Sequence, residues 1–493
     1  MNVAVFAVVP DSARADDWRA LETRQEEKPV KAREWGVLLV LSGAIFLEGI
    51  DIAMLNIALP SIRDDLGLST GSLQWVVSAY VLGYGGFMLL GGRAADILGR
   101  RRVFLAALLV FLLFSGLGGL AENGAVLVAA RFVTGLAAAF MTPAGLSIIT
   151  TGFEEGPKRD RALMIYGAIG AGGFTLGMVI GGLLTALDWR WVFFMPVGLS
   201  LVLLLAAMLL IPKQAPPERD GQRFDVLGGL TVTAAVVVLV LGVERATHVG
   251  IGWTAGTIAL SAVLIAAFVV VERRHAAPLV RLGIFKSGSL LRANVIGMLF
   301  MAGFFGFQFL AVLYLQELRG WTTIEASLAM LVMGIDVALA PTLTPKLVRR
   351  FGNAPVLLAG LASAAVAFAL FLTAGHDSTY WELLPSLVFV GLAFTLAYGP
   401  MTIIATNGIA EDEQGLAGGL LYTSFQFGAA LGLAGVAAVN VAATASDAPG
   451  ALLDGYRAAL LVPLAAAVVA VAVGVFNLGR TRESAPEPEP VAV

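Results

Sequence analysis

The chain contains no cysteine, and only 14% of its 493 residues are charged. The lack of cysteine excludes disulfides, thiol catalysis and cysteine metal sites. Histidine is almost as scarce: His248, His275 and His376 lie far apart, without metal-binding spacing. The sequence also shows no histidine–acid cluster and no nucleotide-binding loop. We therefore expect no metal site, no cofactor and no enzymatic activity.

The scarcity of charge also indicates the solvent. Soluble domains carry about 25% charged residues, whereas this chain is 58% hydrophobic. Too few polar groups remain to cover a globular surface, so we expect a lipid bilayer around the protein. The net charge is −3 and no basic tract is present, so nothing indicates a nucleic acid partner. The apolar run at 3–9 is too short for a secretory signal.

Long apolar runs predict an all-α integral membrane protein. A bilayer core needs roughly 20 apolar residues per helix, and we count fourteen such runs between charged or turn-forming breaks. The predicted spans are 36–60, 73–92, 103–121, 125–150, 162–187, 191–211, 225–244, 253–271, 288–315, 323–345, 354–374, 381–406, 415–441 and 456–478.

The distribution of basic residues predicts the orientation. If both termini are cytoplasmic, 26 of the 32 Lys and Arg residues fall in cytoplasmic tails and loops, and only five fall outside. Arg131 lies within a span. This bias follows the positive-inside rule and predicts a multi-pass protein of the plasma membrane, such as a bacterial inner membrane.

The spans divide into six, two and six. Two halves of similar size suggest a transporter with its site between them. The basic turns GGRAADILGRRRVF and PKLVRRFGNAPV follow the second span of each half as a weak internal echo, although any short cytoplasmic turn resembles these. The predicted parts are a cytoplasmic tail at 1–34, a six-helix half at 35–211, a linker with two extra helices at 212–287, a six-helix half at 288–480 and a disordered tail at 481–493.

Two acids interrupt the first span, SGAIFLEGIDIAMLNIALPSI. Glu48 and Asp51 are three residues apart and so share a helix face. At 1.5 Å per residue Asp51 lies about 22 Å above the cytoplasmic end, a depth that matches Arg131 in the fourth span. We interpret Asp51 as a proton carrier regulated by Arg131, or alternatively as half of a permanent ion pair. Glu48 is a cation-binding or second proton site, or a hydrogen-bonded spectator.

The substrate site is less defined. Asp336 lies near the middle of its span and could hold a cationic drug, titrate, or stay neutral through a hydrogen bond. Phe304 and Gln308 of the aromatic ninth span, with Tyr422 and Gln426 of the thirteenth, are candidate cavity residues. Either aromatic could instead face lipid or core, whereas lipid-facing amides are disfavoured.

Several motifs resemble the major facilitator superfamily. GGRAADILGRRRVF resembles its signature loop, which implies a latch that holds the halves together on the cytoplasmic side and breaks during alternating access. The alternative is that the arginines only anchor topology. The loop residues that match are Gly92, Asp96, Gly99, Arg100 and Arg101.

Three further motifs are similar to those of the fourteen-helix drug:proton antiporter branch: DIAMLNIALP at 51–60, RFVTGLAAAF at 131–140 and GFTLGMVIGG at 173–182. The last contains a small-residue face that permits close helix approach. The sequence departs from the branch at Thr134, usually Gln, at Met178, usually Pro, and at Pro196, usually Asn. The glycines of the small-residue face are Gly173, Gly177, Gly181 and Gly182.

The resemblance implies proton-coupled efflux of hydrophobic or amphipathic, cationic drugs by alternating access, by a protein that functions as a monomer. The expected partners are a small-molecule substrate, protons and the lipid bilayer. A dedicated exporter of one endogenous metabolite, antibiotic or lipid is an alternative, as is a facilitator without proton coupling. A membrane enzyme or a channel fits the sequence poorly.

Overall fold

The structure is a computed structural model that describes most of the chain. Every regular element in this part of the chain is a helix. The described residues are 32–153, 157–213, 225–245, 251–275, 278, 280, 282–407, 409, 414–444 and 450–483.

Most of the helices follow one another with short connections. The first six are α2 (Ala32–Leu66), α3 (Thr70–Leu98), α4 (Arg100–Gly119), α5 (Gly124–Gly152), α6 (Pro157–Leu187) and α7 (Trp191–Leu210). The next elements are α8 (Val226–Arg245), α9 (Ile251–Arg274), η1 (Leu282–Lys286), α10 (Gly288–Leu313) and η2 (Tyr314–Leu318). The last are α11 (Thr323–Met330), η3 (Leu331–Ile335), α12 (Asp336–Phe351), α13 (Asn353–Phe371), α14 (Tyr380–Thr406), α15 (Gln414–Ala443) and α16 (Ala451–Glu483).

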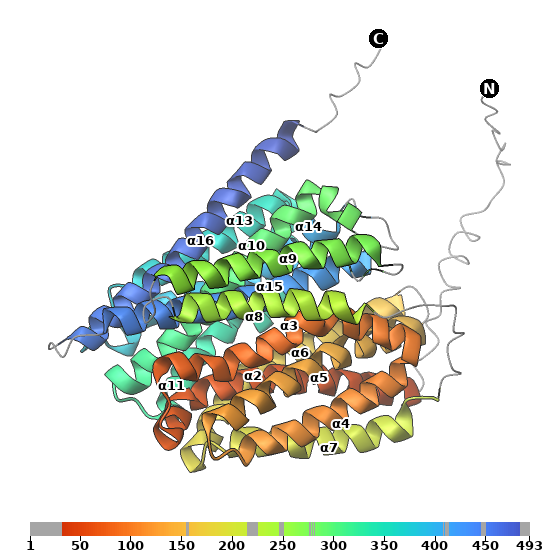
Figure 1. The fold of residues 1–493 in the computed structure, drawn as a ribbon, viewed down its shortest axis with the longest axis horizontal. Helices are drawn as coiled ribbons and strands as arrows, with labels where there is room; N and C mark the ends of the chain where they lie inside the picture. The colour runs from red at the N-terminus through yellow and green to blue at the C-terminus, as the bar shows by residue number, and fades with distance from the viewer. Residues whose placement is uncertain are drawn as a thin grey trace, which may run out of the picture.

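Thirteen helical stretches of the described chain are long and apolar enough to cross a membrane. The shorter apolar helix Leu227–Val243, within α8, completes the expected series of fourteen. One span is composite, because α11, the 3₁₀ helix η3 and α12 together form Thr323–Phe351. The even count brings the start of α2 and the end of α16 to the same end of the bundle; in Figure 1 the chain enters α2 at the right, and α16 rises from the lower left to end at the top. We call this the terminus side.

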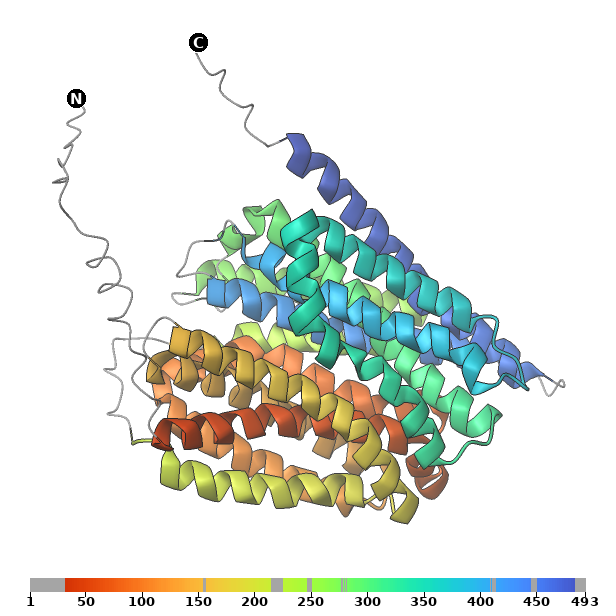
Figure 2. The same ribbon diagram turned by 180° about the vertical axis from the view of Figure 1, so that it is seen from behind.

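Two groups of helices lie side by side. Figures 1 and 2 show α2 to α7, the N-terminal half, on one side and α10 to α16, the C-terminal half, on the other. The extra helices α8 and α9 lie on the face turned to the viewer in Figure 1, where α8 contacts both α3 and α15. The halves repeat each other's packing: α2 packs on α6 as α10 packs on α15, and α4 packs on α7 as α13 packs on α16.

Glycines bring α6 against α2. An added Cβ would lie 2.5 Å from the Phe46 carbonyl oxygen at Gly173, 2.8 Å from the Cα of Ile50 at Gly177, and 2.6 Å from the Cα of Met54 at Gly181. Because a side chain cannot occupy that space, the four-residue glycine spacing sets how closely the two helices approach.

The C-terminal half uses the same device. Gly428 and Gly432 of α15 are also four residues apart and lie against the backbone of α10. A Cβ at Gly432 would lie 2.5 Å from the Cα of Ala302. Matched glycine faces therefore set how closely α6 packs on α2 in one half and α15 packs on α10 in the other.

The two halves also share a turn. Gly99 separates α3 from α4 with φ 95°, and Gly352 separates α12 from α13 with φ 85°. Both values lie in the region that favours glycine. The two basic turns, which are similar in sequence, thus also share a glycine with positive φ.

Met178 lies in the middle of α6, where the related motif has proline. The helix runs without interruption from Pro157 to Leu187, and Met178 is fully buried. A proline would lack the N–H group that bonds to the Phe174 carbonyl. The methionine therefore leaves this helix without a proline kink.

Candidate functional site

Close packing of α3 on α5 positions the polar residues of both helices. Gly135 of α5 lies against the backbone of Tyr80, where an added Cβ would be 2.9 Å from the Tyr80 Cα. Gly91 of α3 lies equally close to α5, since its Cβ would be 2.9 Å from the Cα of Phe140. The short distance between the helix axes brings tyrosines of α3 within reach of α5 and α2.

Asp51 and Arg131 form a buried ion pair. Nη1 of Arg131 donates to Oδ2 of Asp51 at 2.6 Å, and the two side chains are 2% and 1% exposed. The guanidinium makes two further contacts with α3: Nε donates to the Val76 carbonyl at 3.3 Å, and the group lies 4.4 Å from the centre of the Tyr80 ring. The structure thus places the two residues that we matched by depth in direct contact.

Thr134 does not help to hold the arginine side chain. Its hydroxyl donates within α5, to the carbonyls of Ala130 at 3.1 Å and Arg131 at 2.9 Å. The related motif has glutamine here, a longer side chain with an amide. In this protein Asp51 and α3 hold the guanidinium instead.

Glu48 is held by hydroxyl groups. Tyr84 of α3 donates to Oε2 at 3.0 Å, and Thr142 of α5 donates to Oε1 at 2.6 Å. The two hydroxyls also lie 2.9 Å apart. Glu48 is 4% exposed, and among the described residues no cationic side chain pairs with it.

One hydrogen bond crosses between the halves beside this cluster. Nδ2 of Asn56 in α2 donates to Oε1 of Gln308 in α10 at 3.1 Å. Gln308 is 1% exposed, and its own Nε2 has no protein partner in the described structure. Gln308 thus lies at the interface of the halves, in contact with Asn56, which is five residues along α2 from Asp51.

Aromatic side chains cross the same interface. The Phe304 ring of α10 lies 6.2 Å from Phe174 of α6 and 5.2 Å from Phe394 of α14. Phe394 stacks on Tyr398 at 5.1 Å, and the Tyr398 hydroxyl lies 2.5 Å from that of Tyr422 in α15. We call these five residues the aromatic path.

The remaining substrate candidates lie apart from one another. Gln426 packs on α3, since a Cβ on Gly85 would lie 2.5 Å from the Gln426 Cβ. Asp336 begins α12 directly after η3, is partly exposed, and makes no hydrogen bond to the Glu48–Asp51 cluster in the described structure. The structure therefore brings Gln308, Phe304, Tyr422 and Gln426 to the interface of the halves, and it places Asp336 at the start of α12, a helix that contacts α6 across this interface.

The basic loop after α3 makes its described contacts within the N-terminal half. Arg100 donates to the Thr151 hydroxyl of α5 at 2.7 Å, and Arg101 donates to the carbonyls of Met208 and Ile211 at the end of α7, both at 2.9 Å. Such contacts satisfy helix C-terminal carbonyls. Gly99 makes the turn already described.

The other two predicted residues of this loop are part of α3. Gly92 makes no close backbone approach, since an added Cβ would lie 3.7 Å from the nearest atom, in Pro143. Asp96 belongs to the last turn of α3, and its side chain falls outside the described part.

The opposite side of the bundle carries contacts between the halves. Arg63 of α2 and Glu317 of the π-helix η2 form an ion pair at 2.5 Å. Gln316, also in η2, donates to the Ile57 carbonyl at 3.0 Å. Nearby, Gly182 of α6 lies against Ser327 of α11, where an added Cβ would be 2.6 Å from the serine Cβ.

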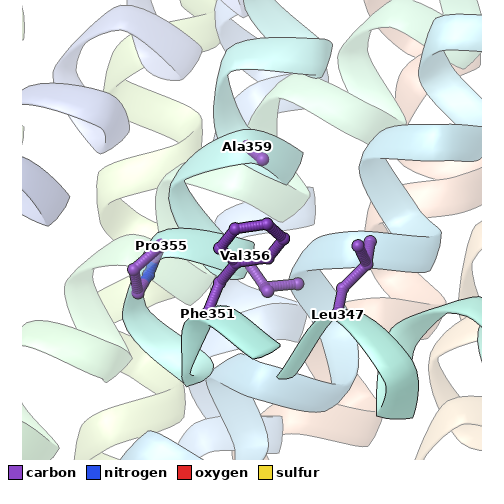
Figure 3. A pocket seen from close by; sticks show the side chains of 5 residues that line it. All are labelled: Leu347, Phe351, Pro355, Val356 and Ala359. Carbon is purple, nitrogen blue, oxygen red and sulfur yellow. The ribbon is translucent and has the colours of Figure 1, made fainter. Parts of the chain in front are cut away.

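Figure 3 shows a small apolar pocket beside the α12–α13 turn. Its lining offers no polar side chain for a proton or a charged group, so it does not belong to the candidate site. The lining residues are Leu347, Phe351, Pro355, Val356 and Ala359.

Residues 41–433 match the family model of the Major Facilitator Superfamily. The chain belongs to this superfamily. As a member of the major facilitator superfamily it is a multi-pass transporter of the plasma membrane and not an enzyme. Its transport site is thus expected between its two halves.

Similar proteins support the same assignment. The puromycin resistance protein pur8 of Streptomyces alboniger is 34% identical over 92% of this chain and 93% of its own length. The cephamycin export protein CmcT of Amycolatopsis lactamdurans is 36% identical over 88% of this chain and 90% of its own. A crystal structure of the nucleoside transporter NupG has the same fold, with a TM-score of 0.66 at 14% identity over 90% of this chain and 99% of that chain.

Sequence reasoning missed several residues of this transporter's site. Asn56 stands out as a polar residue in an apolar span, so a census of such residues would have found it. Tyr84, Thr142 and Tyr398 carry hydroxyls that are common in membrane helices, and no spacing rule connects them to Glu48 or Tyr422. Only the packing of α3, α5, α14 and α15 reveals them.

Proposed function

We propose that this protein exports hydrophobic or amphipathic, cationic compounds in exchange for protons by alternating access. Two observations support the proposal. The similar proteins include resistance and export proteins for antibiotics. In addition, Glu48, Asp51 and Arg131 form a buried charged cluster in the half that contributes Asn56 to the interface. Intramembrane ionisable residues are costly in free energy, and they commonly mark substrate or ion pathways and proton relays.

The cluster couples protons to cargo through charge. A proton arriving at one of the two carboxyl groups adds one positive charge beside Arg131, and a cationic cargo makes the same change. Both cannot be accommodated at once without an extra buried charge, so proton and cargo displace each other. Competition of this kind is the basis of exchange.

The aromatic path is the proposed contact surface for the cargo. Stacked rings favour flat apolar groups and attract cations through their faces. The hydroxyls of Tyr398 and Tyr422 and the amides of Gln308 and Gln426 offer hydrogen bonds. Asp336 at the start of α12 is a second acidic group for a cationic cargo.

The proposed orientation places the terminus side in the cytoplasm. The contacts of Arg63 with Glu317 and of Gly182 with Ser327 then close the outer end of the interface. Arg100 and Arg101 lie at the cytoplasmic end, where we propose that the loop from Gly92 to Arg101 latches the halves in the alternate state.

Everted membrane vesicles with an imposed pH gradient test the proposal. We expect ethidium, an amphipathic cation, to dissipate the gradient in vesicles that contain the protein, but not in vesicles with the Asp51→Asn/Glu48→Gln double variant. Ethidium transport that is unaffected by collapse of the gradient would instead show an uncoupled facilitator.

A dedicated exporter of one antibiotic is the second candidate, supported by the cephamycin export protein among the similar proteins. A panel of puromycin, lincomycin, a cephamycin and ethidium distinguishes the two. Resistance to several unrelated classes supports the broad exporter, and resistance to one class supports the dedicated exporter.

A further inference from the structure

We propose that Glu48 is the carboxyl group that exchanges the proton, while Asp51 remains the fixed counter-ion of Arg131. The inference refines the proposed function and rests on it. The sequence alone favoured Asp51 as carrier, because of its match in depth to Arg131. The contacts of the two carboxyl groups favour Glu48.

Asp51 is poorly suited to take up and release a proton. Its pair with Arg131 is short, at 2.6 Å, and almost completely buried. If Asp51 took up a proton, the guanidinium would lose this counter-charge and keep only neutral partners, among them the Val76 carbonyl and the Tyr80 ring. A buried cation without a counter-ion is strongly unfavourable, so the pair resists protonation.

Glu48 has no such counter-charge. Its described partners are the hydroxyls of Tyr84 and Thr142, which carry no charge. A carboxylate in a membrane interior is unstable without a cation, whereas a neutral carboxyl group only needs hydrogen bonds. Gaining or losing a proton at Glu48 therefore leaves no other buried charge stranded.

The hydroxyl groups can satisfy both forms of Glu48. With the carboxylate ionised, Thr142 donates to Oε1 and Tyr84 donates to Oε2, as the distances of 2.6 and 3.0 Å allow. With a proton on Oε1, the carboxyl O–H donates to the Thr142 oxygen. The Thr142 hydrogen then turns to the Ala138 carbonyl, 3.1 Å away on α5.

Only one hydroxyl hydrogen rotates in this exchange, and no heavy atom has to move. The balance is simple: one proton arrives from water at Oε1 and one leaves by the same route. Thr142 accepts in one state and donates in the other, so it acts as the positioning residue of Glu48.

The surroundings of Glu48 are consistent with this role. The charged groups nearest to it are Asp51 on its own helix and Arg131 beyond Asp51. Four phenols face it electrostatically: Tyr80 and Tyr84 from α3, Tyr166 from α6 and Tyr422 from α15. Tyr422 ends the aromatic path, so the proton site lies beside the proposed cargo surface.

Infrared difference spectroscopy of the full-length protein in lipid, titrated between acidic and alkaline buffer, tests the inference without any substrate. A protonated carboxyl group has a distinct C=O stretch. Among the titrating carboxyl bands, we expect one that disappears in Glu48→Gln but persists in Asp51→Asn/Arg131→Gln, where both charges of the pair are removed together. Thr142→Val should alter the band and its titration, while Thr142→Ser should behave as wild type.

Persistence of every titrating band in Glu48→Gln, or an equal effect of Thr142→Val and Thr142→Ser on the assigned band, would overturn the assignment. A band lost only when Asp51 is changed would return the proton to that residue. The proposed function fails separately, if ethidium evokes no proton movement in wild-type vesicles. The titration can therefore succeed or fail independently of transport.

Discussion

Arg63 and Glu317 join the two halves of the protein at the end opposite the chain termini. Nη1 of Arg63 lies 2.5 Å from Oε1 of Glu317, and the hydroxyl of Tyr456 donates to the other carboxylate oxygen at 3.1 Å. The acid belongs to a π-helix, a rare geometry that is frequent at functional sites. Because the partners lie on different halves, this pair must break whenever that end of the interface opens.

Glu317→Gln should make this end open more often. A partly exposed ion pair contributes up to about 1 kcal/mol, which corresponds to about a fivefold change in an equilibrium constant. Ser327→Cys supplies a buried reporter, and the natural chain has no other thiol. We expect maleimide to label the reporter about fivefold faster when Glu317→Gln is added.

Asp64→Asn is the control for this experiment. Asp64 lies 3.3 Å from Arg63 on the same helix, so its loss removes a charge contact without separating the halves. Equal labelling in the Glu317→Gln and Asp64→Asn backgrounds would show that the ion pair between the halves does not hold the end closed.

Removing one partner of the Asp51–Arg131 pair should destabilise the protein. Asp51→Asn or Arg131→Gln alone leaves a buried charge or a polar group without its partner, at a cost of about 3–5 kcal/mol in the free energy of unfolding. The double variant removes both charges and should cost less than the sum of the single changes.

Denaturation of the purified protein in detergent measures all three. Asp65→Asn, in the exposed pair with Arg190, should cost no more than about 1 kcal/mol; additive single changes would contradict the prediction.

Gly173 and Gly172 offer a matched pair of substitutions. Gly173→Ala places a Cβ 2.5 Å from the Phe46 carbonyl oxygen, while at Gly172 no atom lies within 4 Å of an added Cβ. Both changes gain the same helix propensity. We expect Gly173→Ala to cost about 1–3 kcal/mol of stability through overpacking and Gly172→Ala to be neutral or stabilising. Thermal unfolding in detergent gives the comparison, and similar midpoints would show that α2 and α6 are not held by this contact.

Tyr422→Phe should change how the protein handles its cargo without unfolding it. The ring stays, but the hydroxyl that lies 2.5 Å from that of Tyr398 is lost. A hydrogen bond contributes about 0.5–1.5 kcal/mol, so we expect a change of roughly two- to tenfold in the ethidium concentration for half-maximal transport. Tyr380→Phe, at the start of α14, is the control. No difference between the two variants would remove the hydroxyl pair from the cargo surface.

The sequence predicts most of the fold because lipid simplifies the problem. Apolar length alone located the spans, and even α8, whose apolar part is the short stretch Leu227–Val243, was anticipated. The break at η3 was not anticipated, since Leu331–Ile335 has no proline or charge to mark it. Its geometry arises from packing, with Gly334 against Thr175 of α6.

Much less of the site could be predicted. Asp51 and Arg131 were matched because a helix converts residue number into depth. To predict the partners of Glu48, one must know how each helix is rotated about its axis as well as the depth of each residue. That rotation depends on the close packing of α3 on α5 at Gly135 and Gly91. The Arg63–Glu317 pair was missed because a π-turn changes which way the end of α10 faces, and no simple pattern in the sequence predicts that turn.

The position of α8 makes the two long edges of the transporter unequal. Where α3 meets α15, α8 covers the joint from the lipid side, with Thr233 packed against Gly86. Where α6 meets α11 and η3, the described structure has no such cover. A hydrophobic molecule dissolved in the surrounding bilayer thus meets a walled edge on one side and a bare one on the other. The two edges of the interface thus differ in their exposure to lipid, and this difference arises from α8, one of the two helices added to the twelve of the two halves.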